Sequence, residues 1–170
     1  GRFTWKHMDI IFYFLILHNF WQKASIMGIS GKETEKYQII QAIRELWALL
    51  TEKQRLFLIT HISLKKLKKN EYIYHENDTP EFLYCLVQGK IKIFKEGIGR
   101  RSQIVRMVKP EGFFGYRAGF ANDQYSTSAS AFEAVTVCQI PLPVIIKIIH
   151  ENNDVAIYFI QQLASLLGHD

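Results

Sequence analysis

One stretch of the chain has residues suited to ligand binding. It runs Gly112-Phe113-Phe114-Gly115-Tyr116-Arg117-Ala118-Gly119-Phe120, and three hydroxyl side chains follow it, those of Ser126, Thr127 and Ser128. Three glycines within eight residues are costly inside a regular strand or helix, but they suit a backbone that turns sharply or approaches a ligand closely. Backbone N–H groups in such a turn could hold a small anion beside the hydroxyls. The alternative is a tight barrel corner without a ligand, and the local residues alone favour it.

The other reactive residues give little support for metal chemistry. Cys85 and Cys138 lie far apart, each inside an apolar alternating run, so we expect buried free thiols in a reducing compartment. No two of the six histidines share the spacing of a metal site. We therefore predict no metal and no cofactor. Haem ligands are hard to read from sequence, and His61, His75 and Cys85 are weak candidates.

Composition indicates one soluble globular domain. The 170 residues are 48% apolar and 22% charged, which is ordinary for a folded protein with a substantial core. The net charge of +5 permits a nucleic-acid partner without establishing one. Much of the positive charge lies in Lys65-Lys66-Leu67-Lys68-Lys69, and such a run is typical of a solvated strand edge that resists aggregation.

The hydrophobic period changes twice along the chain. Residues 31–63 have helical spacing behind two capping boxes, Ser30-Gly31-Lys32-Glu33 and Thr51-Glu52-Lys53-Gln54, so two helices are expected there. Residues 64–143 alternate, with turn signals every 8–12 residues, which indicates a sandwich or barrel of seven or eight strands. The predicted fold is mainly β with flanking helices, and an eight-stranded jelly roll fits best. The expected strands are 64–69, 72–75, 82–87, 90–95, 102–108 and 128–140, the last being one long strand or a bent pair.

Residues 144–170 return to helical spacing. A short helix is expected over 144–150, and Asn152-Asn153-Asp154 offers caps for a long one. The apolar residues of the long helix cover two faces, so it needs two surfaces to bury against, its own barrel and a partner helix. The predicted dimer contacts are Tyr158, Phe159, Gln162, Leu163, Leu166 and Leu167. The alternative is a helix buried wholly in its own domain.

Residues 1–30 lie outside this pattern. Their apolar run, Ile10 to Leu17, is shorter than the roughly 20 residues that span a bilayer, and no small-x-small cleavage pattern follows it. We expect an interaction helix, or a start site assigned too far upstream with Met27 as the true initiator. No membrane association is expected, and the predicted location is the cytoplasm. No terminating signal precedes Asp170, so we expect a longer parent protein.

The order of these parts resembles the effector domain of the Crp/Fnr family of bacterial transcription regulators, which has a cyclic-nucleotide-binding-type fold. The resemblance runs from about Gln38 to Asp170. Tyr84-Cys85-Leu86-Val87-Gln88-Gly89-Lys90-Ile91-Lys92-Ile93 is similar to the family's strand-glycine-strand signature, and Gly112-Phe113-Phe114-Gly115 is similar to the entrance of its phosphate-binding cassette.

The chain departs from the cAMP-binding members at two positions. In those members a glutamate that holds the ribose follows the second glycine, and here that residue is Tyr116. About ten residues later they carry an arginine for the cyclic phosphate, and here that residue is Ser126. A buried phosphate needs an opposing guanidinium or comparable charge, because leaving the phosphate charge unpaired costs several kcal/mol of binding free energy. The backbone donors and the hydroxyls could still hold another small anion or polar ligand, and the alternative is a regulator that has lost its effector. Arg117 could turn inward, but it is offset from both positions, so we expect it to be exposed on the surface. The expected site residues are Phe114, Gly115, Tyr116, Arg117, Ala118, Ser126, Thr127 and Ser128.

The resemblance implies a sensory domain rather than an enzyme. It implies a homodimer formed through the C-terminal helix, DNA binding by a helix-turn-helix domain beyond Asp170, and RNA polymerase as a partner of the full-length protein. An iron–sulfur sensor would need a cysteine cluster, and residues 1–63 contain no cysteine. Two alternatives stay open. A cupin-type metalloenzyme would need clustered His and Glu ligands, and a regulatory cyclic-nucleotide domain of a channel or kinase would lack the same acidic and arginine positions.

The two departures predict weak binding of the usual nucleotides. Calorimetric titration with cAMP and with cGMP should reveal no binding tighter than roughly 100 μM, which corresponds to about −5.5 kcal/mol. Micromolar affinity for either nucleotide would contradict this reasoning.

Overall fold

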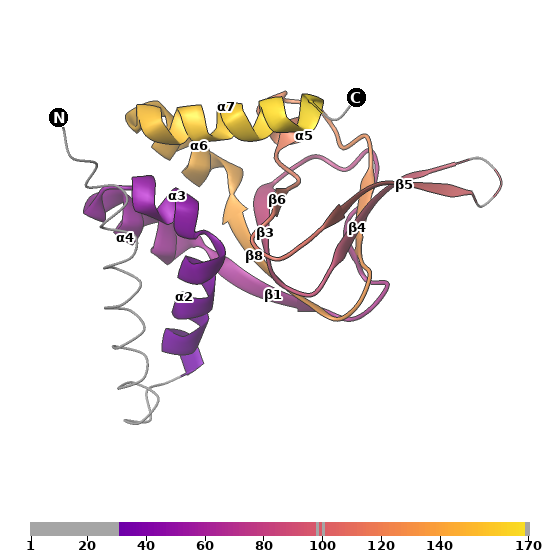
Figure 1. Ribbon diagram of the computed structural model, residues 1–170, viewed down its shortest axis with the longest axis horizontal. Coiled ribbons are helices and arrows are strands. Elements are labelled where there is room, and N and C mark those ends of the chain that lie inside the picture. Colours follow the sequence, from indigo (N-terminus) through magenta and orange to yellow (C-terminus); the bar gives the residue numbers. More distant parts are fainter. Residues whose placement is uncertain (1–30, 98, 100, 169–170) are drawn as a thin grey trace.

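The computed structural model describes residues 31–97, 99 and 101–168 of the chain (Figure 1). The expectations for residues 1–30, including the Ser30 cap and Met27, and those for Asp170 lie outside the described residues. The described part is mainly β, with helices gathered on one side of a barrel-like pair of sheets (Figure 1).

Eight strands form two antiparallel sheets within the described residues. One sheet has the order β1-β8-β3-β6 and the other β2-β7-β4-β5. The predicted run 128–140 is a bent pair, because it divides into β7 and β8, which belong to different sheets. The two-residue strand β6 was not expected from the sequence. The strands are β1 (Ser63–Leu67), β2 (Tyr72–Tyr74), β3 (Phe82–Gln88), β4 (Ile91–Glu96), β5 (Ser102–Val108), β6 (Phe113–Phe114), β7 (Ser128–Ala131) and β8 (Val135–Pro141).

The helices follow the predicted order with one difference. The N-terminal region holds three described helices instead of two, because the first apolar run is interrupted at Ile43. The capping box at Thr51 is confirmed: the Gln54 backbone N–H donates to Thr51 Oγ1 at 3.2 Å, and the Thr51 N–H donates to Gln54 Oε1 at 3.1 Å. The helices are α2 (Gly31–Ala42), α3 (Arg44–Leu49), α4 (Glu52–His61), α5 (Arg117–Phe120), α6 (Leu142–Glu151) and α7 (Asn153–Leu167).

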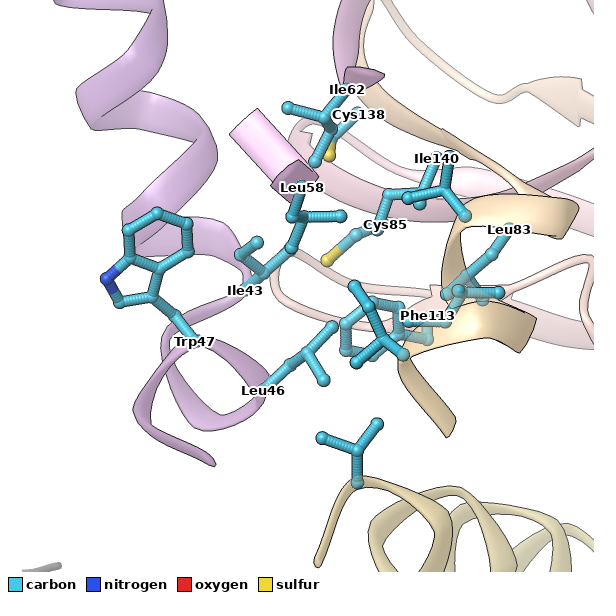
Figure 2. Packing of buried hydrophobic residues seen from close by; sticks show 14 of the residues in the cluster. Ile43, Leu46, Trp47, Leu58, Ile62, Leu83, Cys85, Phe113, Cys138 and Ile140 are labelled. Atoms are coloured by element: carbon cyan, nitrogen blue, oxygen red, sulfur yellow. The ribbon is translucent and has the colours of Figure 1, made fainter. Parts of the chain in front are cut away.

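Strand β3 is apolar on both faces because two cores meet on it. Leu83 and Cys85 point toward the helices, whereas Tyr84 and Leu86 point into the barrel. Figure 2 shows Cys85 and Phe113 turned toward Ile43 and Leu46 of the helical region. A strand buried on both sides loses the alternation of a half-exposed one, which explains its continuous apolar run.

Asn152 connects α7 to the N-terminal helices. Its Oδ1 accepts from the backbone N–H groups of Asp154 at 3.1 Å and Val155 at 3.3 Å, as the sequence predicted for a cap. Its Nδ2 donates to Leu49 O at 2.9 Å and to Gln54 Oε1 at 3.0 Å. One side chain therefore caps α7 and holds it against α3 and α4.

Replacing this residue should destabilise the fold measurably. We expect Asn152→Ala to lower the free energy of unfolding by about 2 kcal/mol, because it removes an N-cap and leaves the Leu49 carbonyl without this donor. Chemical denaturation with far-UV circular dichroism measures the change. The neighbouring exposed Asn153→Ala is the control and should stay within about 0.5 kcal/mol of the wild type. Equal losses in the two variants would contradict the assigned role.

Candidate functional site

A cavity of about 740 Å³ lies between the glycine-rich stretch, the second sheet and α7. A volume of this size suits a small organic ligand. Six of the eight predicted site residues line it: Gly115, Tyr116, Arg117, Ala118, Ser126 and Thr127. The structure thus brings the two halves of the predicted site together.

The backbone at Gly115 shapes one wall of the cavity. Its φ is +75°, a left-handed conformation that disfavours residues with a Cβ. A Cβ at this position would lie 2.8 Å from Tyr84 Cδ2 and 3.3 Å from both Tyr125 Oη and Tyr74 Cε2. Glycine is therefore required by conformation and by space.

Phe114 and Ser128 do not line the cavity. Phe114 is fully buried in the barrel core, 5.3 Å from Tyr84 between ring centroids. The Ser128 hydroxyl accepts a hydrogen bond from the Glu76 backbone N–H at 3.0 Å, and its side chain is buried. Both residues belong to the buried interior of the domain instead.

Tyr116 occupies the position of the ribose-binding glutamate without filling the cavity. It is 2% exposed, and its ring packs beside Phe120 at 5.8 Å and Phe159 at 6.2 Å, in the core shared with the helices. Burial raises the pKa of its hydroxyl, and the nearby Arg106 cation opposes that rise. A neutral aromatic contact to α7 therefore stands where the resemblance implies a carboxylate.

Arg117 is exposed, as expected, but it also lines the cavity. Its Nη2 donates to Ser126 Oγ at 2.8 Å. The hydrogen bond places a guanidinium group beside Ser126, the residue at which the resemblance expects an arginine.

Outside α7, the residues Tyr74, Arg106 and Tyr125 line the cavity and were missed by sequence reasoning. Tyr74 and Tyr125 stack with ring centroids 3.6 Å apart, and Tyr125 Oη donates to Gly115 O at 3.1 Å. Arg106 enters the cavity from β5, where it lies opposite the buried Ile93. The signal for Arg106 was its position two residues before the apolar Val108, on the same face of the strand.

Burial and two nearby arginines have opposite effects on the pKa of the Tyr74 hydroxyl. Burial raises the pKa of Tyr74 to about 12, while a hydrogen bond from Thr127 and the cations of Arg106 and Arg117 act in the opposite direction. The phenol stays protonated at neutral pH and can donate or accept a hydrogen bond.

Helix α7 closes the cavity through Gln162, Ser165, Leu166 and Leu167. Four residues predicted at a dimer interface pack against the core of their own domain: Tyr158, Phe159, Leu163 and Leu166. Phe159 is 2% exposed, and Tyr158 contacts its ring and donates its hydroxyl to Glu45 Oε2 at 3.3 Å. They face the domain because the helical core, including Phe113, occupies that side of α7.

The opposite side of α7 carries exposed apolar residues. Ile157, Ile160 and Leu167 are 53%, 58% and 74% exposed. With the exposed Ala164 they follow a three-four-three spacing, which is that of a coiled-coil contact. We call these four residues the α7 seam.

The described part of the chain contains neither a metal-binding group nor a membrane-spanning helix. Over residues 31–97, 99 and 101–168, no three His, Cys, Asp or Glu side chains gather in a metal-binding group. Among the same residues, no helix has the length and apolar character needed to cross a membrane. Cys85 and Cys138 face each other across β3 and β8 as buried free thiols, and burial raises the pKa of both.

The close contacts of Gly115 predict a large effect of a single methyl group. Gly115→Ala should lower the free energy of unfolding by about 3 kcal/mol, through left-handed strain and collision with Tyr84. Gly99→Ala is the matched control, since Gly99 has a φ of +76° but open space around its Cβ position, and it should cost about 1 kcal/mol. Thermal and urea unfolding measure both. Similar costs for the two variants would contradict the packing described around Gly115.

Comparison with known proteins agrees with this geometry. Residues 64–152 match the model of the cyclic nucleotide-binding domain. An uncharacterized protein of Haemophilus influenzae is 26% identical over 103 residues, which cover 61% of this chain and 80% of that protein. The sensor domain of the transcriptional regulator DNR from Pseudomonas aeruginosa superposes with a TM-score of 0.69 at 18% identity, covering 78% of this chain and 90% of that one.

A second solved structure has a similar fold. The regulatory domain of Toxoplasma gondii PKA, crystallised with cAMP, has a TM-score of 0.61 at 23% identity and covers 68% of this chain and 44% of that one. These structural likenesses concern the fold, while the match over residues 64–152 spans more than half of the sequence. The chain therefore belongs to the cyclic nucleotide-binding domain family.

Proposed function

We propose that the chain is the effector-sensing and dimerisation domain of a Crp/Fnr-type transcription regulator whose effector is not cAMP bound in the usual mode. The observation that carries the proposal is the position of α7. Gln162, Ser165 and Leu166 face the cavity, while Ile157 and Ile160 face away from the domain.

This position gives one helix two roles. A ligand in the cavity contacts α7 directly, so its binding free energy depends on where α7 lies. The dimer contact of the α7 seam depends on the same position. Leu167 belongs to both surfaces, because it lines the cavity and is 74% exposed. Ligand binding and dimer geometry are then linked through a shared element, as a sensor requires.

The α7 seam is the proposed dimer contact in place of Tyr158 and Phe159. Two such seams related by a two-fold axis bury the exposed isoleucines against each other. The small Ala164 side chain allows the helices to approach closely at the centre of the contact. The result is a symmetric homodimer that places both cavities beside the same helix pair.

The larger regulator is part of the proposal. Its DNA contact is assigned to a helix-turn-helix domain beyond α7, with RNA polymerase as a further partner and the cytoplasm as its location. The likeness to the DNR sensor domain, which covers 90% of that chain, supports this assignment. A kinase-regulatory role is the second candidate, supported by the Toxoplasma gondii fold, but the α7 seam favours a symmetric regulator.

A single charged side chain introduced into the α7 seam tests the dimer contact. We expect Ile160→Asp to weaken dimerisation at least tenfold, because it places a carboxylate in an apolar contact. Analytical ultracentrifugation over a dilution series measures the dissociation constant. Ile104→Asp is the control, since Ile104 is 52% exposed on β5 and outside the seam. A monomeric wild type, or an Ile160→Asp variant that dimerises as well as the wild type, would overturn the proposal.

A further inference from the structure

Two guanidinium groups face the cavity from separate elements. Arg106 comes from β5 and is half-buried, and Arg117 comes from α5. None of the described residues that line this cavity is acidic. Neither arginine forms an ion pair with a carboxylate in the described part of the chain. Positive charge that is partly removed from water without a counter-charge is costly, so the cavity favours an anion.

Both arginines line the same cavity as Tyr74 and Thr127. Their positive charges lower the pKa of the Tyr74 hydroxyl and so oppose the effect of burial. Arg117 uses a single Nη2 contact to Ser126, which leaves further N–H donors for a ligand. Guanidinium N–H pairs match the two oxygens of a carboxylate, sulfonate or phosphate group.

Most of the remaining wall is apolar or aromatic, with Gln162 and Ser165 of α7 as polar residues on it. Ile93 and Val105 line it from β4 and β5, and Leu166 and Leu167 line it from α7. The stacked rings of Tyr74 and Tyr125 add a flat aromatic wall. A ligand that fills such a cavity needs an apolar body as well as a charged head.

We propose that the effector is an amphipathic organic anion, with its charged head between Arg106 and Arg117 and its apolar body against α7. This inference rests on the proposed sensing function and names the ligand class of the same site. The positive charge that selects an anionic ligand comes from Arg106 on β5 and Arg117 on α5, because residue 126 is a serine. Arg106 is the residue that decides anion preference, because it is the less exposed of the two arginines.

A pair of dyes that differ in charge tests the inference. 8-Anilinonaphthalene-1-sulfonate is an amphipathic anion, and N-phenyl-1-naphthylamine has the same ring system without the sulfonate. We expect the wild type to bind the anion at least tenfold more tightly than the neutral dye, in one site per chain. Arg106→Gln should remove that preference by weakening the anion at least tenfold, about 1.4 kcal/mol, with the neutral dye unchanged within twofold. Arg117→Gln should act in the same direction.

The controls separate this cavity from other surfaces. Arg101→Gln removes the same charge from an exposed side chain outside the cavity, and both dyes should bind as in the wild type. Amide chemical-shift changes at Gly115 and Ser126 should report binding in the cavity rather than on the α7 seam. If Arg106→Gln does not fold, Arg106→Lys keeps the charge but loses the paired donors, and it should show intermediate anion affinity.

The outcomes distinguish the inference from the function on which it rests. Equal affinity of the wild type for the two dyes, or an anion affinity unchanged by Arg106→Gln, would overturn the anion assignment and leave a ligand-binding cavity. Failure of both dyes to perturb Gly115 and Ser126 would count against ligand sensing itself.

Discussion

Phe113 and Phe114 are successive residues on opposite faces of one sheet, and this alternation joins the two cores of the domain. Phe114 lies in the barrel beside Tyr84, whereas Phe113 contacts Phe159 of α7 at 5.9 Å between ring centroids. Aromatic pairs of this kind add about 0.5–1.5 kcal/mol each beyond the area they bury. The turn at Gly115 follows immediately, so its position is set from the barrel and from the helices together.

This constraint makes α7 part of the site. Phe159 contacts Phe113 and Tyr116, and the next turns of the helix reach the cavity through Gln162 and Leu166. A displacement of α7 therefore changes both the aromatic contacts beneath the glycine-rich stretch and the apolar wall above it. The proposed sensing mechanism uses that coupling: a ligand favours the α7 position that completes its own contacts. Tyr116, in place of a carboxylate, strengthens the link to α7.

Local patterns were sufficient to predict much of the fold. Alternation and turn residues gave β5 over 102–108 as it is observed, and the caps at Thr51 and Asn152 form the expected hydrogen bonds. The break at Ile43 and the two-residue β6 were missed because both involve distant segments: the Ala42 carbonyl accepts from the Cys85 thiol at 3.4 Å, and β6 pairs with β3.

The site was harder to predict than the fold. Residues of the glycine-rich stretch could be identified because they are contiguous. Arg106 and Tyr74 were missed, because strand pairing brings them to the same cavity; the spacing of Arg106 to Val108 indicates only which face of β5 it shares. The same reason explains the error at Phe159: helical spacing shows that α7 has two apolar faces, but only the docked domain shows which face is already covered.

The most direct test of the coupling through α7 is the dimer dissociation constant measured with and without 8-anilinonaphthalene-1-sulfonate at saturation. Coupling through α7 should change this constant by at least about fivefold, since coupling free energies between linked sites are typically 1–3 kcal/mol. Arg106→Gln, which should bind the anion at least tenfold more weakly, provides the reference at the same dye concentration and should show a smaller change. An identical dissociation constant for the free and the saturated wild type would contradict the claim that one helix serves both the cavity and the dimer.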